Sequence, residues 1–130
     1  MQWHASATPG ELRVKGNDVL LQQALLNLLY NAFDATLRHD KPTVGVEIST
    51  HNQHVQLRVM DNGDGVSEAV AAQLFEPFHT NPGRSTGLGL GLTLARQIVV
   101  DHGGGIDYQP SPDRGSIFTI SLPLVKGVPA

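Results

Sequence analysis

The segments Gly87-Leu88-Gly89-Leu90-Gly91-Leu92 and Asp61-Asn62-Gly63-Asp64-Gly65 say most about how this chain folds. The first leads into a run of residues with helical spacing, and the second follows a run that alternates as a strand does. Neither continues into the Gly-Lys-Ser/Thr of a P-loop, and neither has the Gly-x-Gly-x-x-Gly spacing of a dinucleotide fingerprint. Two separate glycine-rich turns around one site predict a nucleotide that is held from two sides.

Composition limits the class of protein. The chain has 130 residues, 40% of them hydrophobic, which suits one domain with an ordinary core. A formal net charge of −3 gives no basic excess, so we expect no nucleic-acid partner. No apolar run approaches the ~18 residues of a membrane span, so we expect no direct membrane contact. The absence of cysteine excludes disulfides and thiolate zinc sites, and fits a cytoplasmic location.

The start of the chain does not resemble a signal peptide, and we expect a fragment of a longer protein. Three parts are expected: a linker remnant or disordered tail over 1–10, the domain over 11–124 and a C-terminal tail over 125–130. Periodicity within the domain predicts helices and alternating strands. The expected elements are a short strand over 11–15, a helix over 18–38, a hairpin of strands over 44–48 and 55–59, a short helix over 67–74, a loop over 75–87, a helix from 88 to 102, and strands around 106–108 and 118–122.

This order of elements predicts a two-layer α/β (α+β) sandwich. The sheet is expected to be mixed but largely antiparallel, because two of its strands form the hairpin. About three helices are expected to cover one face of the sheet.

The helix expected over 18–38 carries an unusual polar stripe. Its members recur at steps of three or four residues and therefore share one face; they are Gln23, Asn27, Asn31, Asp34 and Arg38. Such a stripe is often only a solvated face. Two asparagines in mid-helix are mediocre helix formers, however, and this favours a ligand site.

Asp61 ends the alternating run and shares the parity of Val55, Leu57 and Val59. If the strand extends that far, the carboxylate points toward the helix-covered side, where it needs a donor. The exocyclic amine of adenine is such a donor. The alternative is an ordinary tight turn, for which Asp-Asn-Gly is common.

The run from Gly87 to Gly91 opens a helix. Free N–H groups and the helix dipole at that point favour phosphate. A flexible hinge without a ligand is the alternative.

Four segments in this order resemble the boxes of histidine-kinase catalytic domains. Residues 27–35 (NLLYNAFDA) resemble the N box, 61–65 (DNGDG) the first glycine box, 74–78 (LFEPF) the F box and 86–90 (TGLGL) the second glycine box. The resemblance covers roughly residues 12–123. It implies the Bergerat ATP-binding fold, which the family shares with gyrase, mismatch-repair ATPases and a heat-shock chaperone.

The resemblance implies roles for individual residues. Asn31 would coordinate Mg²⁺ between the phosphates of ATP, and Asn27 would help to hold that end. Asp61 would bind adenine in a pocket shaped by Gly63 and Gly65. Residues 75–87 would form a lid anchored by Phe75 and Phe78. The remaining nucleotide-binding positions would be Asp34, Arg84, Thr86, Gly87, Leu88, Gly89, Leu90 and Ser116.

One position separates kinase from hydrolase. Related ATPases generally carry a glutamate one helical turn before the metal asparagine, where it activates water. Asn27 occupies that position here, and an amide is no base at neutral pH, so we expect slow hydrolysis. The resemblance instead implies phosphoryl transfer to a histidine on a separate dimerisation domain, and indirectly a response regulator as partner. A parent protein anchored in the inner membrane is compatible with this expectation.

The acceptor histidine is not expected within this chain, because His39-Asp40-Lys41-Pro42 follows the N box and reads as a loop. The lid departs from the family pattern: it has no lysine after Phe78, and Arg84 is the expected substitute for its charge. Two alternatives to a histidine kinase therefore stay open. One is a serine kinase of the anti-sigma type, which would normally retain the glutamate, and the other is a non-catalytic ATP sensor.

Overall fold

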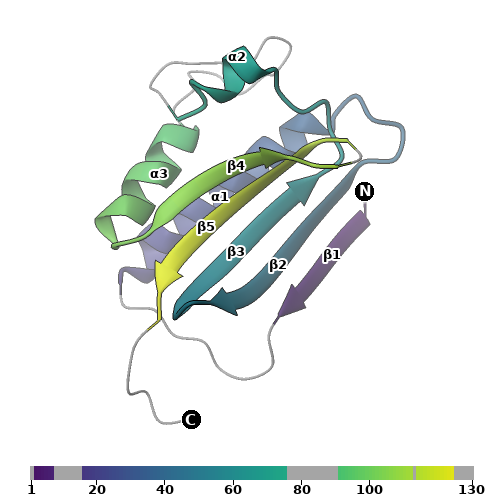
Figure 1. Cartoon of the computed structure of the whole chain (residues 1–130). Helices are drawn as coiled ribbons and strands as arrows, with labels where there is room; N and C mark the ends of the chain where they lie inside the picture. The colour runs from purple at the N-terminus through teal and green to yellow at the C-terminus, as the bar shows by residue number, and fades with distance from the viewer. Residues whose placement is uncertain (1, 8–15, 76–90, 113, 125–130) are drawn as a thin grey trace.

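A computed structural model describes residues 2–7, 16–75, 91–112 and 114–124. One five-stranded sheet has the strand order β1-β2-β3-β5-β4, and the helices lie against one of its faces (Figure 1). The sandwich expected from the sequence is therefore confirmed. The elements are β1 (Gln2–Ala7), α1 (Asp18–Ala35), β2 (Thr43–His51), β3 (His54–Asp61), α2 (Glu68–Ala71), α3 (Gly91–Asp101), β4 (Gly105–Pro110) and β5 (Ser116–Pro123).

The N-terminal segment corrects the sequence-based expectation. Residues 1–10 were expected as a linker remnant or a disordered tail, but β1 pairs in parallel with β2, from Gln2 opposite Thr43 to Ala7 opposite Ile48. An edge strand is held by main-chain hydrogen bonds to one neighbour and can form without a regular alternation of apolar residues. This strand has little such alternation, so the sequence pattern did not indicate it. A parallel pair also requires a long crossover, which α1 supplies. The short strand expected over 11–15 and the tail over 125–130 lie outside the described residues.

Helix α1 begins where expected and ends earlier. The Asn17 side chain accepts a hydrogen bond from the Leu20 N–H at 3.1 Å and caps the first turn. The helix ends at Ala35, and Thr36 caps it by bonding to carbonyls of the last turn. The Thr36 hydroxyl donates to the Phe33 carbonyl at 2.9 Å, and the residue is fully buried. The α1–β2 connection therefore starts about three residues sooner than periodicity indicates.

The core lies between the sheet and the two long helices. Helix α1 contributes Leu28 and Ala32, and α3 contributes Ala95 and Val99, all of them fully buried. The sheet side is formed by alternate residues, which are Val44, Val55, Val59, Phe118, Ile120 and Leu122. Removing these side chains from water is the main stabilising term of the domain.

The antiparallel strands fix the register around the end of β3. The turn between β2 and β3 has positive φ at Asn52 (49°) and Gln53 (65°), as a two-residue hairpin turn requires. In the resulting register Asp61 lies opposite Val44 on one side and Ser116 on the other. Two distant segments therefore meet at this end of the sheet.

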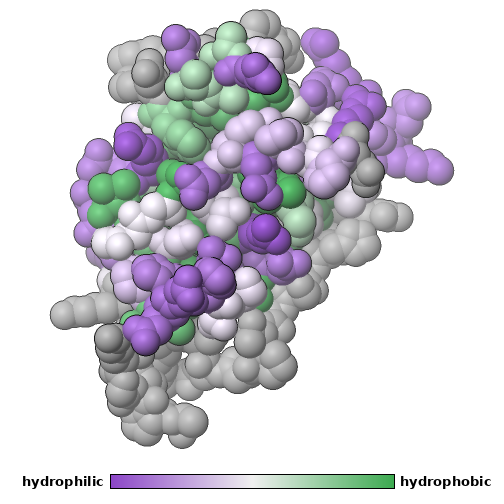
Figure 2. All heavy atoms as spheres, in the orientation of Figure 1, coloured by the Kyte–Doolittle hydropathy of each residue, from purple (hydrophilic) through white to green (hydrophobic). Residues whose placement is uncertain are grey.

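Helix α2 is shorter than its sequence pattern. Helix α2 covers only Glu68–Ala71, capped by Ser67, whereas 67–74 was expected. None of the helices in the described part of the chain is long and apolar enough to cross a membrane. In the view of Figure 2, hydrophobic side chains gather over α2 at the top, and hydrophilic ones over the α1–β2 connection at the upper right.

Candidate nucleotide-binding site

Asp61 is buried at the carboxyl end of β3, with only 6% of its surface exposed. It shares its parity with Val55 and Val59, which are also buried, so the inward orientation expected from the alternation is confirmed. Its Oδ1 atom accepts a hydrogen bond from the Gly63 N–H at 2.9 Å. This bond shapes the start of the glycine-rich turn and fixes the direction of the carboxylate.

Gly63 packs directly against the end of α1. A Cβ atom at this position would lie 2.2 Å from the carbonyl oxygen of Ala35 and 2.6 Å from its carbonyl carbon. Only glycine allows such an approach between two backbones. The contact joins the turn after β3 to the helix that carries the polar stripe.

A second glycine approach brings the β4–β5 turn onto the same segment. Gly115 has φ +104°, and a Cβ atom there would lie 1.9 Å from the Asp61 carbonyl oxygen. Gly65 has φ +70°, a backbone conformation that other residues adopt only with strain. The turn over 61–65 is thus enclosed by α1 on one side and by the β4–β5 turn on the other.

Ser116 lies beside Asp61 in the sheet and is 1% exposed. Its hydroxyl has no hydrogen-bond partner among the described residues. Buried polar groups are nearly always paired, because an unpaired one loses its bonds to water without replacement. A hydroxyl in this state, next to a buried carboxylate, fits a site completed by a polar ligand.

The polar stripe of α1 divides into two kinds of position. Asn31 is 8% exposed and belongs to the buried part. Asn27 and Asp34 are half-buried, and the Asn27 Oδ1 accepts a bond from the Gln23 Nε2 at 2.8 Å. Gln23 is exposed. Arg38 is exposed too, but it lies beyond the end of α1 at Ala35 and does not share the helix face, contrary to expectation. The interpretation as a solvated face therefore applies to Gln23 at the start of the stripe, and it does not fit the buried Asn31 in the middle.

Helix α1 is only partly buried. Val19 is 73% exposed, Leu26 is 42% exposed and Tyr30 is 60% exposed. The side that packs on β2, β3 and α3 is buried, and the opposite side is open despite its apolar residues.

Seven of the expected site residues fall in the segment 76–90, outside the described residues. The described residues before and after this segment are joined: the Thr93 hydroxyl on α3 donates to the Phe75 carbonyl at 2.9 Å. The seven positions are Phe78, Arg84, Thr86, Gly87, Leu88, Gly89 and Leu90.

Asn62, which the sequence analysis did not select, bonds the turn to the strand beside it. Its Oδ1 accepts from the Thr43 N–H at 2.9 Å, and its Nδ2 donates to the Lys41 carbonyl at 2.9 Å. In the same connection the His39 Nδ1 accepts from the Lys41 N–H at 2.9 Å. The segment 39–42 is therefore a loop, as expected, that supports the turn.

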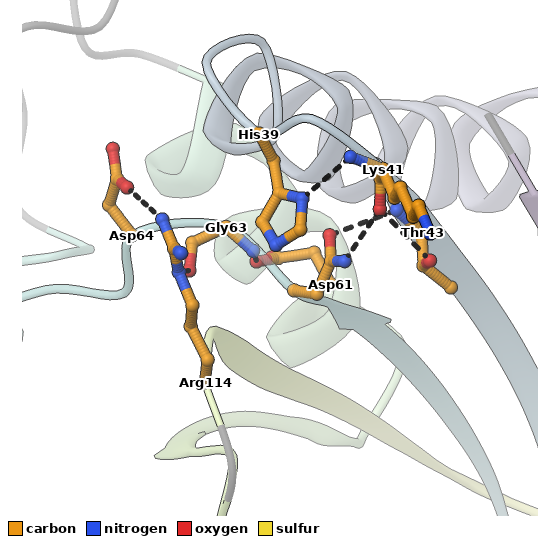
Figure 3. Close-up of polar contacts among 8 residues, drawn as sticks. His39, Lys41, Thr43, Asp61, Gly63, Asp64 and Arg114 are labelled. Carbon is orange, nitrogen blue, oxygen red and sulfur yellow. Dashed lines mark hydrogen bonds and ion pairs between the residues drawn. The ribbon is translucent and has the colours of Figure 1, made fainter.

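Arg114 was also missed, and it holds the turn from the opposite side (Figure 3). Its Nε donates to the Gly63 carbonyl at 3.1 Å, and its Nη2 lies 2.9 Å from the Asp64 Oδ1. No local pattern indicates either bracing residue, because each depends on which distant strand arrives beside the turn.

Comparison with known families agrees with a nucleotide-binding site at this end of the sheet. The family model of the histidine kinase-, DNA gyrase B- and HSP90-like ATPases matches residues 16–126, which is most of the chain. The chain belongs to this ATPase family. The likeness to histidine kinases and the Bergerat-type fold expected from the sequence are thereby confirmed.

Within this ATPase family, the chain is similar to sensor histidine kinases. It is 37% identical over 122 residues to the C4-dicarboxylate transport sensor protein DctS of Rhodobacter capsulatus, covering 90% of this chain and 18% of DctS. It is 37% identical over 129 residues to the sensory histidine kinase/phosphatase NtrB of Azospirillum brasilense, covering 85% of this chain and 30% of NtrB. The chain therefore spans between 18% and 30% of the length of these relatives.

Solved structures give the same result. A mycobacterial sensor histidine kinase, MprB, superposes with a TM-score of 0.82 at 28% identity, covering 95% of this chain and 83% of that one. The family match and this structural likeness identify the chain as a histidine kinase ATPase domain. An ATPase domain implies ATP binding.

Proposed function

We propose that this domain binds ATP and transfers its γ-phosphate to a histidine on a dimerisation domain elsewhere in a sensor kinase. The observation that carries the proposal is that Asp61 and Ser116 are neighbours across two adjacent strands. Both are buried side by side at the end of the sheet, and the serine hydroxyl has no partner among the described residues. A carboxylate acceptor and a hydroxyl together suit the donor and acceptor edge of adenine.

The adenine end of the site is formed by the sheet and its turn. Asp61 accepts a bond from the exocyclic amine, while Ser116 supports the base. Gly63 and Gly65 shape the turn beside the ring: Gly63 packs closely against Ala35, and Gly65 has φ +70°. A charge-assisted hydrogen bond of this kind contributes roughly 1.5–3 kcal/mol.

The phosphate end is assigned to α1 and to the segment 76–90. Asn31 would hold Mg²⁺, and Asn27 and Asp34 lie on the same face of the helix. The described residues contain no group of three His, Cys, Asp or Glu that would hold a metal ion alone. This fits Mg²⁺, which keeps several ligands from water and phosphate and needs few from the protein. The remaining nucleotide-binding positions are assigned to Phe78, Arg84, Thr86, Gly87, Leu88, Gly89 and Leu90.

Magnesium would supply charge neutralisation on the phosphates, and the protein would supply position. The neutral amide of Asn27 stands where a water-activating base would be needed for hydrolysis. The domain by itself is therefore a poor ATPase, and its catalytic role is to present the γ-phosphate to the acceptor.

The proposed partners follow from the same comparison. The acceptor is the kinase's own dimerisation domain, and a response regulator receives the phosphoryl group next. One structural neighbour is the histidine kinase ThkA in complex with the response regulator protein TrrA, at 26% identity and a TM-score of 0.77. We place this domain in the cytoplasm, with a parent protein that is allowed a membrane tether.

Calorimetric titration with ATP and ADP, with and without Mg²⁺, tests the proposal. Asp61→Asn and Asn31→Ala should each weaken ATP binding at least tenfold, the loss expected for a charge-assisted bond or a metal contact. Asp107→Asn on exposed β4 and Gln22→Ala on exposed α1 are the matched controls, expected to bind as the parent does. Site variants that bind ATP as tightly as the parent would show that the site assignment is wrong.

Phosphotransfer is tested separately. The domain is incubated with labelled ATP and a separately supplied dimerisation domain, and acid-labile phosphohistidine is the expected product. Tight ATP binding without transfer would contradict the kinase and favour a sensor. Acid-stable phosphoserine on a protein partner would favour the anti-sigma type.

A further inference from the structure

The turn over 61–65 contains two glycines and one exposed aspartate, so its sequence alone does not hold it in one conformation. In the folded protein it is braced from both sides. Asn62 bonds it to the start of β2 through the Thr43 N–H and the Lys41 carbonyl. On the other side, Arg114 bonds it to the β4–β5 turn.

The Arg114 brace has a geometry that only arginine provides. One guanidinium spans the Gly63 carbonyl at 3.1 Å through Nε and the Asp64 carboxylate at 2.9 Å through Nη2. The fork is rigid, so both bonds form at little further cost in conformational freedom. A lysine ammonium is a single point charge and cannot hold both acceptors with the same geometry.

The Arg114 bond to the Gly63 carbonyl matters because Gly63 is also bonded to Asp61. The Gly63 N–H donates to the Asp61 Oδ1 at 2.9 Å, and the Gly63 carbonyl accepts from Arg114. Both sides of one residue are therefore fixed, one by the buried carboxylate and the other by the guanidinium. Movement of Gly63 would change the direction in which Asp61 presents its carboxylate.

We propose that Arg114 is a positioning residue for base recognition, which pre-organises the Asp61–Gly65 turn and thereby sets both affinity for adenine nucleotides and discrimination against guanine. This rests on the proposed function. A preformed site loses less freedom when the ligand binds, so the brace contributes to affinity without touching the ligand. The Arg114–Asp64 ion pair by itself contributes little, because the two side chains are 53% and 60% exposed.

Binding measurements on three variants separate these contributions. Arg114→Gln removes the charge and the fork, Arg114→Lys keeps the charge and loses the fork, and Asp64→Asn removes only the ion pair. We expect Arg114→Gln and Arg114→Lys to weaken ATP and ADP about five- to tenfold alike, and Asp64→Asn to change affinity less than twofold. The ratio of the GTP to the ATP dissociation constant should fall in both Arg114 variants.

Matched controls come from the sheet. Arg58 and Glu47 form a comparable ion pair, 3.6 Å apart with side chains 38% and 40% exposed, between β3 and β2. Arg58→Lys and Glu47→Gln should leave both affinity and base discrimination unchanged. Hydrogen exchange at the amides of Gly63, Asp64 and Gly65 should accelerate in the Arg114 variants, while urea unfolding stays close to that of the parent.

Three outcomes would overturn the inference. The first is an Arg114→Gln protein that binds ATP within twofold of the parent and discriminates against GTP as well. The second is a loss for ATP that spares ADP, because a phosphate contact and not a brace would then explain it. The third is unchanged exchange at the turn. A parent that binds no nucleotide would refute the proposed function instead, which distinguishes the two failures.

Discussion

Replacing Gly63 with alanine tests the joint between α1 and the turn after β3. The added Cβ would lie 2.2 Å from the Ala35 carbonyl oxygen and 2.6 Å from its carbon. Restoring an ordinary contact of 3.4 Å requires a shift of 3.4 − 2.2 = 1.2 Å. Both sides of the contact are backbone, one at the end of a long helix and the other in a braced turn, so no flexible side chain can move aside.

Two effects of this substitution oppose each other. Alanine restricts the unfolded chain and would stabilise the protein by about 0.4–1 kcal/mol at a compatible site. Overpacking costs about 1–3 kcal/mol, and the upper end applies because the obstacle is backbone. The clash prevails, and we expect Gly63→Ala to lower the free energy of unfolding by about 2 kcal/mol.

Urea unfolding followed by far-ultraviolet circular dichroism measures this loss. Gly105→Ala is the matched control, since a Cβ there meets no atom within 4 Å, and we expect it to be neutral or slightly stabilising. A Gly63→Ala protein within 0.5 kcal/mol of the parent, an allowance about as large as a neutral surface substitution produces, would refute the close backbone contact.

Two further predictions concern buried hydroxyl groups without partners among the described residues, those of Ser116 and Tyr108. Ser116→Ala should leave the nucleotide-free protein equally stable or up to about 1 kcal/mol more stable, because an unpaired polar group is removed. Its dissociation constant for ATP should nevertheless rise several-fold by calorimetry; a loss of stability without a loss of affinity would contradict the assignment. Tyr108→Phe should keep the ring contact with Phe118, whose centroid is 5.2 Å away, and should be neutral or stabilising in urea. A loss of more than about 1 kcal/mol would show that the hydroxyl is bonded after all.

Several elements could be predicted from local spacing alone. Apolar residues one helical turn apart predict α1, and alternation predicts β2, β3 and the burial of Asp61. The order of four family segments predicts the ATPase fold. Each helix or strand signal, and each family segment, lies within a short stretch, so it can be recognised without knowing what packs on it.

Other features depend on segments that are distant in sequence. Strand β1 has little pattern of its own and exists because β2 offers it an open edge. Asn31 and Gln23 share one helical face, yet only Asn31 is buried. The spacing of the polar residues predicts which face of the helix they share. Which of them are buried depends on the segments that pack against that face.

The sequence by itself determined the order of helices and strands from α1 to β5 and the inward-facing acid, because periodicity is a local property of the chain, and it determined the family through four short motifs. Only the tertiary structure decided what holds that acid in place. Arg114 lies 51 residues from Gly63 along the chain and 3.1 Å from it in space. That distance exists because β5 pairs with β3, and no spacing within either segment contains that information.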